Sequence, residues 1–190
     1  MNSFYTDDEL GLIGFSNYGK DVKLSRKTSI YHPERITIGE HVRIDDFCIL
    51  SAGANGFISI GSFVHIAAYC MIEAPAGFVM EDFSGLAGRC TIYGGSDNYS
   101  GQFLTNPCVP AHTRQETSAK VHLKEHAVVG ASSVILPGVT IGHGSAVGSM
   151  SLVTKSVPDF EIYAGIPAKF IKVRLSNTVI LGEQVKGSVL

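Results

Sequence analysis

Proton transfer is the chemistry for which this sequence supplies the clearest candidates. Histidine changes its charge near neutral pH and is the usual general base. His65 directly precedes the aliphatic Ile66, so in a strand the two side chains point to opposite sides, with His65 outside. In the polar segment 94–101, Asp97 lies among hydroxyl and amide groups, and His112 follows in the same loop. These three residues are candidate bases, although an outward histidine at a subunit contact or a turn-forming aspartate has the same pattern.

Cysteine is the second residue type with possible chemistry. Three cysteines each lie two residues before an aliphatic residue that recurs along the chain, and two serines occupy the same position farther on. These five residues are Cys48, Cys70, Cys90, Ser133 and Ser151. A metal or redox site is one interpretation. A buried column of small side chains is the one we favour, because there is no Cys-x-x-Cys motif and a thiol packs as a small apolar group. Cys108 lies apart from this column and has no assigned role.

A repeat of six residues must position these side chains. An aliphatic residue recurs at every sixth position from 123 to 153: Leu123, Val129, Ile135, Ile141, Val147 and Val153. A period of six fits neither an α-helix nor an alternating strand, and it is the signature of a hexapeptide β-helix. Each hexad forms one flat side of a triangular prism with the aliphatic residue inside, and three hexads close one coil.

The same register continues upstream with interruptions: Ile38, Ile44, Leu50, Ile60, Ile66, Ile72, Met80, Leu86 and Ile92. Fifteen hexads in all predict an all-β fold of about five triangular coils. The interruptions add four, two and 25 residues, each time after the third hexad of a coil. All insertions therefore leave from one corner, and the longest, 93–120, follows the third predicted coil and is long enough to be functional.

The two ends of the chain do not fit the register. We expect an N-terminal cap over 1–37, the β-helix over 38–155, and a C-terminal cap and tail over 156–190. Thr6 and Glu9 ahead of an apolar run form a capping-box pattern, which predicts a short helix. The stretch 22–36 is expected to be an irregular lid over the open end of the prism.

The composition and net charge exclude some classes of function. The chain has 190 residues, 45% of them hydrophobic and 17% charged, with a net charge of −2. This balance predicts one globular domain and gives no basic footprint for nucleic acid. There is no signal segment, and no window approaches 18 uninterrupted apolar residues, so we expect a cytoplasmic protein without a membrane span.

The sequence resembles a known family over about 36–174. The segment VVGASSVILPGVTIGHGSAVGSMSLVTKSVP, followed by IYAGIPAKFIKVR, is similar to the left-handed β-helix acyltransferases, especially the sugar acetyltransferases of surface-polysaccharide clusters and the galactoside and maltose acetyltransferases. The resemblance implies a left-handed coil, an exception to the right-handed crossover rule. It also implies a homotrimer with acetyl-CoA in the groove between neighbouring prisms.

The resemblance places the co-substrate on particular residues. The pantetheine arm is expected along Ala131 and Ser149, where only small side chains occur. The nucleotide end is expected at Thr154, Lys155, Lys169 and Lys172, since lysines bind phosphate as point charges. Without the resemblance, a solvated lysine-rich face is the simpler interpretation. No metal is required for this chemistry.

The galactoside acetyltransferases carry a histidine in a Gly-His-Pro-Val motif at the start of the long loop. Alignment on Leu86 to Ile92 places Ser96 or Asp97 there, so that histidine is absent. His65 is our preferred base, with Asp97 as a base or acceptor-binding residue and His112 as a third candidate.

We therefore predict transfer of an acetyl group from acetyl-CoA to a hydroxyl or amino group of a sugar, or of a nucleotide- or lipid-linked sugar, in polysaccharide or O-antigen biosynthesis. Two alternatives remain open. One is a γ-type carbonic anhydrase with zinc on His65, His122 and His126, although these lie on different faces. The other is a scaffold without catalytic activity.

Overall fold

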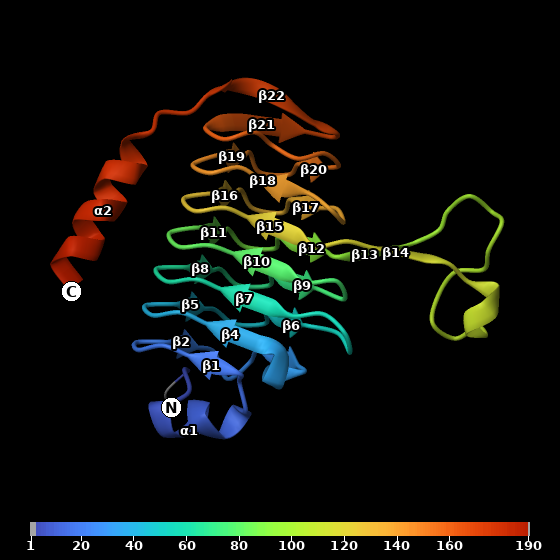
Figure 1. The fold of residues 1–190 in the computed structure, drawn as a ribbon, viewed down its shortest axis with the longest axis horizontal. Coiled ribbons are helices and arrows are strands. Elements are labelled where there is room, and N and C mark those ends of the chain that lie inside the picture. The colour runs from blue at the N-terminus through green and yellow to red at the C-terminus, as the bar shows by residue number, and fades with distance from the viewer. Residues whose placement is uncertain (1–2, 190) are drawn as a thin grey trace.

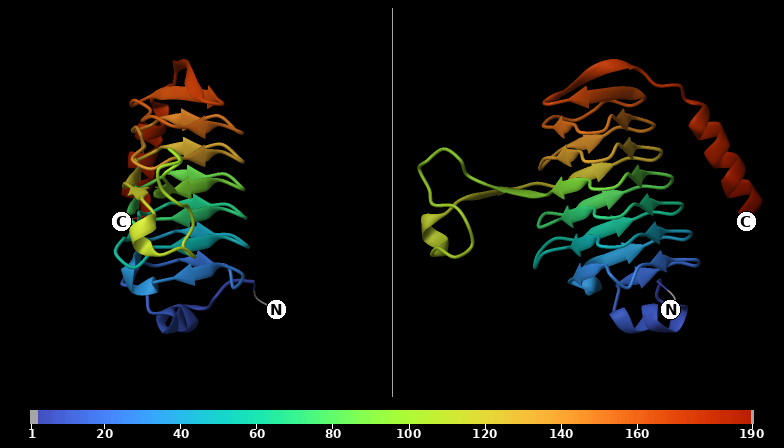
Figure 2. Two further views of the ribbon diagram at one scale, coloured as in Figure 1. Left: turned by 90° about the vertical axis from the view of Figure 1, so that its right-hand side faces the viewer. Right: turned by 180° about the vertical axis from the view of Figure 1, so that it is seen from behind.

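The chain forms a parallel β-solenoid with three flat faces. The computed structural model describes residues 3–189, and its short strands stack in layers along one axis (Figure 1). A long arm leaves one side of the stack, and a helix lies along another side (Figures 1 and 2). No helix within residues 3–189 is long and apolar enough to cross a membrane.

Each face is one sheet, and its neighbouring strands run parallel except for the last pair of the second face. The first face contains β1 (Asn17–Tyr18), β4 (Ile36–Ile38), β7 (Ile58–Ile60), β10 (Phe78–Met80), β15 (Val121–Leu123) and β18 (Thr140–Ile141). The second contains β2 (Lys23–Leu24), β5 (Arg43–Ile44), β8 (His65–Ile66), β11 (Gly85–Leu86), β16 (Val128–Val129), β19 (Ala146–Val147), β21 (Glu161–Gly165) and β22 (Ala168–Val173). The third contains β3 (Ser29–Tyr31), β6 (Ile49–Ser51), β9 (Met71–Glu73), β12 (Thr91–Tyr93), β17 (Val134–Ile135) and β20 (Leu152–Val153).

The core is the axis of the prism, as the six-residue register predicts. All fifteen aliphatic residues of the predicted register are buried, each with at most 3% of its surface exposed. Glycines let successive coils approach each other closely. A Cβ on Gly130 would lie 2.5 Å from the backbone nitrogen of Ser149 in the next coil, so no side chain fits there. The predicted β-helix is confirmed.

The predicted number of five coils is wrong. Within residues 3–189 there are six complete coils and the beginning of a seventh, which β21 forms. The additional first coil is β1 to β3, which pair in register with β4 to β6, so part of the stretch expected to be a cap over 1–37 is solenoid. The inward positions of the terminal coils include Tyr18 and Tyr163, which pack against the core but break the aliphatic pattern. The long insertion therefore follows the fourth coil.

A short helix covers the N-terminal end of the prism. Helix α1 (Asp7–Ile13) begins after Thr6, whose side chain accepts a hydrogen bond from the Glu9 backbone N–H, while the Glu9 carboxylate accepts one from the Thr6 backbone N–H. The predicted capping box is confirmed. Leu10 is buried against the first coil, and a one-turn 3-10 helix, η1 (Pro33–Arg35), links that coil to the second.

The long insertion is an arm with its own hairpin. It leaves from the corner between the third and first faces, as the spacing predicts, and extends away from the coils (Figures 1 and 2). Strands β13 (Gly95–Asp97) and β14 (Glu116–Ser118) pair antiparallel at its base. The distal part contains a short 3-10 helix, η2 (Ala111–Thr113). The arm therefore carries Asp97 at its base and His112 near its end.

The cysteine column is structural. Cys48, Cys70 and Cys90 are free and buried, and each thiol donates a hydrogen bond of 3.2 Å to a backbone carbonyl oxygen, respectively that of Ala67, Ala87 and Gly130. Hydrogen bonds to the two neighbouring thiols, together with burial, raise the pKa of Cys70. Buried, hydrogen-bonded thiols fit the predicted column of small side chains.

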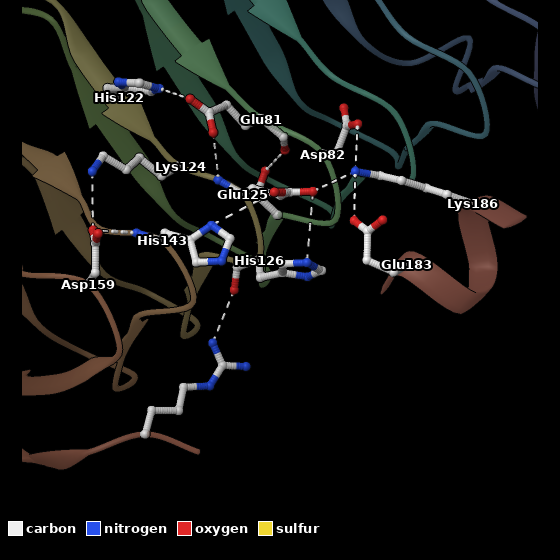
Figure 3. A network of polar contacts seen from close by, with 12 residues as sticks. Glu81, Asp82, His122, Lys124, Glu125, His126, His143, Asp159, Glu183 and Lys186 are labelled. Carbon is white, nitrogen blue, oxygen red and sulfur yellow. Dashed lines mark hydrogen bonds and ion pairs between the residues drawn. The ribbon is translucent and has the colours of Figure 1, made fainter. Parts of the chain in front are cut away.

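The C-terminal helix α2 (Asn177–Val189) docks on the corner between the first and second faces (Figures 1 and 3). Lys186 Nζ lies 2.7 Å from Glu125 Oε1 and above the ring of Phe83. Gly182 packs directly against His126, whose ring stacks on Phe83 at 5.1 Å between centroids. His126 is 5% exposed, and its Nε2 has no hydrogen-bond partner among residues 3–189.

Docking of α2 should weaken as the pH falls through the range in which histidine titrates. Burial lowers the pKa of His126, and Glu125 partly opposes this shift. The other groups around it are His143, Lys186 and Arg174, so a proton on His126 adds a further positive charge beside one carboxylate. A lowered pKa means that the unfolded state binds the proton more readily, so this stability is present above about pH 6.5 and is lost below it.

We expect urea unfolding of the wild type to show lower stability at pH 5.5 than at pH 7.5. His126→Phe keeps a ring on Phe83 but cannot take up a proton, so it should reduce that difference. The other histidines are present in both proteins, so the difference between the two reports on His126 and its contact with His143. An identical loss of stability in the variant would contradict this role for His126.

Candidate active site

A shallow groove of small side chains runs along the second face. Its outward positions form two adjacent columns that step from coil to coil: His65, Gly85, Val128 and Ala146, and beside them Ala67, Ala87, Gly130 and Gly148. A cavity of about 480 Å³ is lined by most of these residues, with His65 at one end. Among residues 3–189, His65 is the only titratable side chain that lines it.

His65 points outward from β8, as the alternation with Ile66 predicts. Its Nε2 lies 2.8 Å from Oδ2 of Asp45 in the preceding coil, and Arg43 Nε donates to Oδ1 of the same carboxylate at 2.7 Å. Burial raises the pKa of Asp45, but the hydrogen bonds from His65 and Arg43 outweigh it and hold that pKa below its usual value. In the tautomer that donates Nε2–H to Asp45, Nδ1 is the free basic nitrogen.

Asp45 was not among the residues that we singled out from the sequence. The six-residue register contained the signal, because Asp45 directly follows inward Ile44 and therefore lies one coil below His65 and one column across. Only the side-chain conformations show that the two groups bond. This pairing orients the imidazole and leaves one nitrogen for proton transfer.

Asp97 lies in a second cavity, at the base of the arm. This cavity has a volume of about 660 Å³, and its polar and aromatic lining includes Glu73, Tyr93, Asp97, Tyr99 and Glu116. Glu116 is paired with Arg114. His112, farther along the arm, is exposed and does not line the cavity. Within one chain the structure therefore keeps His65 and Asp97 in separate cavities.

The predicted co-substrate residues fall into two places. Ala131 and Ser149 follow Gly130 and Gly148 at the corner between the second and third faces. On β22, Lys169 pairs with Ala164 and Lys172 with Ile162, and both partners belong to β21 at the end of the second face. These four residues thus lie on or beside the second face, although the cavity of His65 is lined by none of them and Lys172 lines another cavity.

Thr154 and Lys155 lie elsewhere. They follow β20 at the corner between the third and first faces, where the arm leaves the coils. The structure therefore does not bring Thr154 and Lys155 together with Lys169 and Lys172. Sequence spacing alone does not separate these two pairs of residues. The chain passes from the corner after β20 to the second face, where β21 and β22 lie.

The three histidines considered for zinc are each engaged on a different part of the surface. His65 pairs with Asp45, His122 Nε2 lies 2.6 Å from Glu81 Oε1 on the first face, and His126 is buried under α2 (Figure 3). Within residues 3–189 no three His, Cys, Asp or Glu side chains are grouped so that they could hold a metal ion. The described part of one chain therefore does not bring these three histidines together.

Comparison with known proteins identifies the family. No family model matches the sequence. The chain is 36% identical over 187 residues to a dTDP-4-amino-4,6-dideoxy-D-glucose acyltransferase of Escherichia coli, covering 98% of this chain and 97% of that protein. The chain belongs to the hexapeptide-repeat sugar acyltransferases. It is an acyltransferase that uses an acyl-CoA co-substrate, as the motifs predict.

Solved structures agree with this assignment. AntD, an N-acyltransferase from Bacillus cereus in complex with dTDP and 3-hydroxybutyryl-CoA, is 45% identical and superposes with a TM-score of 0.94 over 100% of this chain and 99% of AntD. A variant of AntD in complex with dTDP-4-amino-4,6-dideoxyglucose and coenzyme A is also 45% identical, with the same TM-score over 99% of both chains. AntD therefore shares its fold with this chain over nearly the whole length of both.

Proposed function

We propose that this sugar acyltransferase transfers the acyl group of an acyl-CoA to the amino group of a nucleotide-linked amino sugar, for surface-polysaccharide synthesis. The acceptor class is that of its relatives, a dTDP-linked 4-amino-4,6-dideoxy sugar. Both substrates are soluble metabolites of the cytoplasm, where we place the reaction.

The observation that supports an amine over a hydroxyl acceptor is the charge of the arm cavity. Glu73 and Asp97 both line it, and within residues 3–189 neither carboxylate has a hydrogen bond or an ion pair. Two such carboxylates favour a cationic ligand. An amino sugar is protonated near neutral pH, whereas a sugar hydroxyl is neutral, so this cavity selects the amine.

The groove on the second face suits the acyl-CoA. A thin pantetheine chain fits over Gly130, Ala131, Gly148 and Ser149, because none of these has a bulky side chain. Lys169 and Lys172, on β22 at the end of the second face, are exposed cations for the phosphates. From β22, which carries them, to β8, which carries His65, there are five steps between neighbouring strands of about 4.8 Å each. The reactive end of the co-substrate would thus lie near His65.

Three side chains supply what the reaction needs from the protein. The amine nitrogen attacks the thioester carbonyl carbon, the C–S bond breaks, and an amide and free coenzyme A form. Asp97 holds the acceptor as its ammonium form, which loses one proton to Nδ1 of His65 before the neutral amine attacks. The second proton that the nitrogen loses passes to the leaving thiolate, so the coenzyme A leaves as a thiol. Asp45 keeps the imidazole oriented through its 2.8 Å contact.

A homotrimer would unite the two halves of this site, since the cavities of His65 and Asp97 are separate within one chain. Cyclic closure is the usual way to repeat such a contact. The third face offers a surface for it, because outward apolar side chains recur there on several coils and are partly buried in one chain: Ile49, Met71, Val134 and Leu152. The arm of one subunit then reaches the groove of its neighbour.

Light scattering at micromolar concentration should give the mass of three chains. Leu152→Lys places a charge in the apolar stripe and should shift the protein toward monomers with loss of activity, while Ser59→Lys on the first face should remain trimeric. A wild-type monomer with full activity would contradict the shared site.

The catalytic assignment is tested with two variants and a dTDP-linked 4-amino-4,6-dideoxyglucose acceptor. His65→Ala should lower kcat by roughly 10²- to 10⁴-fold, as loss of a positioned base does, and leave the KM for acetyl-CoA within about threefold. Asp97→Asn should raise the KM for the amino sugar. Near-normal turnover of His65→Ala together with an inactive Asp97→Asn would instead make Asp97 the base. Transfer to the 4-hydroxy analogue at an equal rate would contradict amine selection.

The two groups of lysines give a matched test of the co-substrate site. Lys169→Ala combined with Lys172→Ala should raise the KM for acetyl-CoA about tenfold or more, with little change in kcat at saturation, because phosphate contacts are lost. Lys155→Ala, at another corner, should change that KM by less than twofold. The reverse pattern would place the phosphates at the corner of the arm.

A further inference from the structure

The groove beside His65 has an unfilled position. On β11, Gly85 lies between His65 and Val128 in the same outward column. A Cβ added there would meet only the carbonyl oxygen of His65, at 3.7 Å, so the space above Gly85 is open. The adjacent column contributes only the methyl groups of Ala67 and Ala87.

The space is large and apolar. The groove has a volume of about 480 Å³, which the pantetheine arm and the acyl group share in the proposed function. An acetyl group has a single methyl group and leaves the space above Gly85 unfilled. Apart from His65, no side chain among residues 3–189 of the same chain that lines the groove can donate or accept a hydrogen bond. The backbone beneath is paired within the sheet, as in the hydrogen bonds from Ala67 N–H to Leu86 and from Ala87 N–H to Val129.

We propose that Gly85 and Ala87 set the acyl specificity of this enzyme, and that it accepts unsubstituted acyl chains of three or four carbons as well as acetyl. This inference rests on the proposed function, in which the thioester lies beside His65. The acyl tail then lies over Gly85 against the methyl groups of Ala67 and Ala87. A hydroxyl on the acyl chain would find no side-chain partner there except the catalytic imidazole, so it would be selected against.

The experiment compares acetyl-, butyryl- and 3-hydroxybutyryl-CoA as donors to one amino-sugar acceptor, with thiol release as the measurement. In the wild type, kcat/KM for butyryl-CoA should at least equal that for acetyl-CoA and exceed that for 3-hydroxybutyryl-CoA about tenfold. An apolar pocket discriminates a missing or additional methylene by roughly 10- to 200-fold. Gly85→Val should therefore lower the butyryl-to-acetyl ratio at least tenfold.

Two further variants complete the design. Ala87→Ser supplies a hydroxyl and should raise the ratio of 3-hydroxybutyryl to butyryl transfer severalfold. Ser59→Val makes a similar change on the first face and should leave all ratios unchanged. Ratios within one variant do not depend on how much of it folds or on its overall activity.

The outcomes separate the two proposals. No transfer from any of the three donors would overturn the proposed function itself. Transfer of acetyl with butyryl more than tenfold worse would leave that function standing and overturn the acyl specificity. An unchanged butyryl-to-acetyl ratio in Gly85→Val would also overturn it, because the acyl tail would then lie elsewhere.

Discussion

The parallel backbone ladder between coils is the constraint on which the rest of this structure depends. Each strand pairs in register with the strands one coil above and below, about 4.8 Å away. An inward position in one coil is therefore inward in every coil, and an outward residue lies directly over its counterpart. Burial of one aliphatic side chain per hexad drives the stacking, and the ladder converts it into columns of side chains.

Columns explain both the stability and the chemistry of the surface. Small side chains at one position give a buried thiol column at Cys48, Cys70 and Cys90, and at another position they give an open groove that ends at His65. The same stacking sets Asp45 diagonally below His65, within hydrogen-bond distance. Chemistry on this fold therefore comes from which residue types occupy a column, and a single glycine such as Gly85 leaves a gap in it.

The segments in which the chain departs from the repeated ladder could be located only from the tertiary structure. The aliphatic pattern did not reveal the terminal coils, because tyrosines occupy inward positions there. These are Tyr18 and Tyr163, at the ends of the prism, where the core is incomplete. Helix α2 has little amphipathic pattern to predict, since it docks through Gly182 and Lys186 on a stack of rings from distant coils. Such contacts between remote segments have no signature in local spacing.

The sequence by itself determined the β-helix, the inward residues, the corner from which the arm leaves, the outward direction of His65 and, through its motifs, the acyltransferase family. Those features depend on local periodicity, which burial of every sixth residue enforces. Only the tertiary structure decided that Asp45 pairs with His65, that Lys169 and Lys172 lie at the end of the second face while Lys155 lies at another corner, and that Asp97 lines a separate cavity. These relations join residues of different coils and corners, and their side-chain geometry is set by packing in three dimensions.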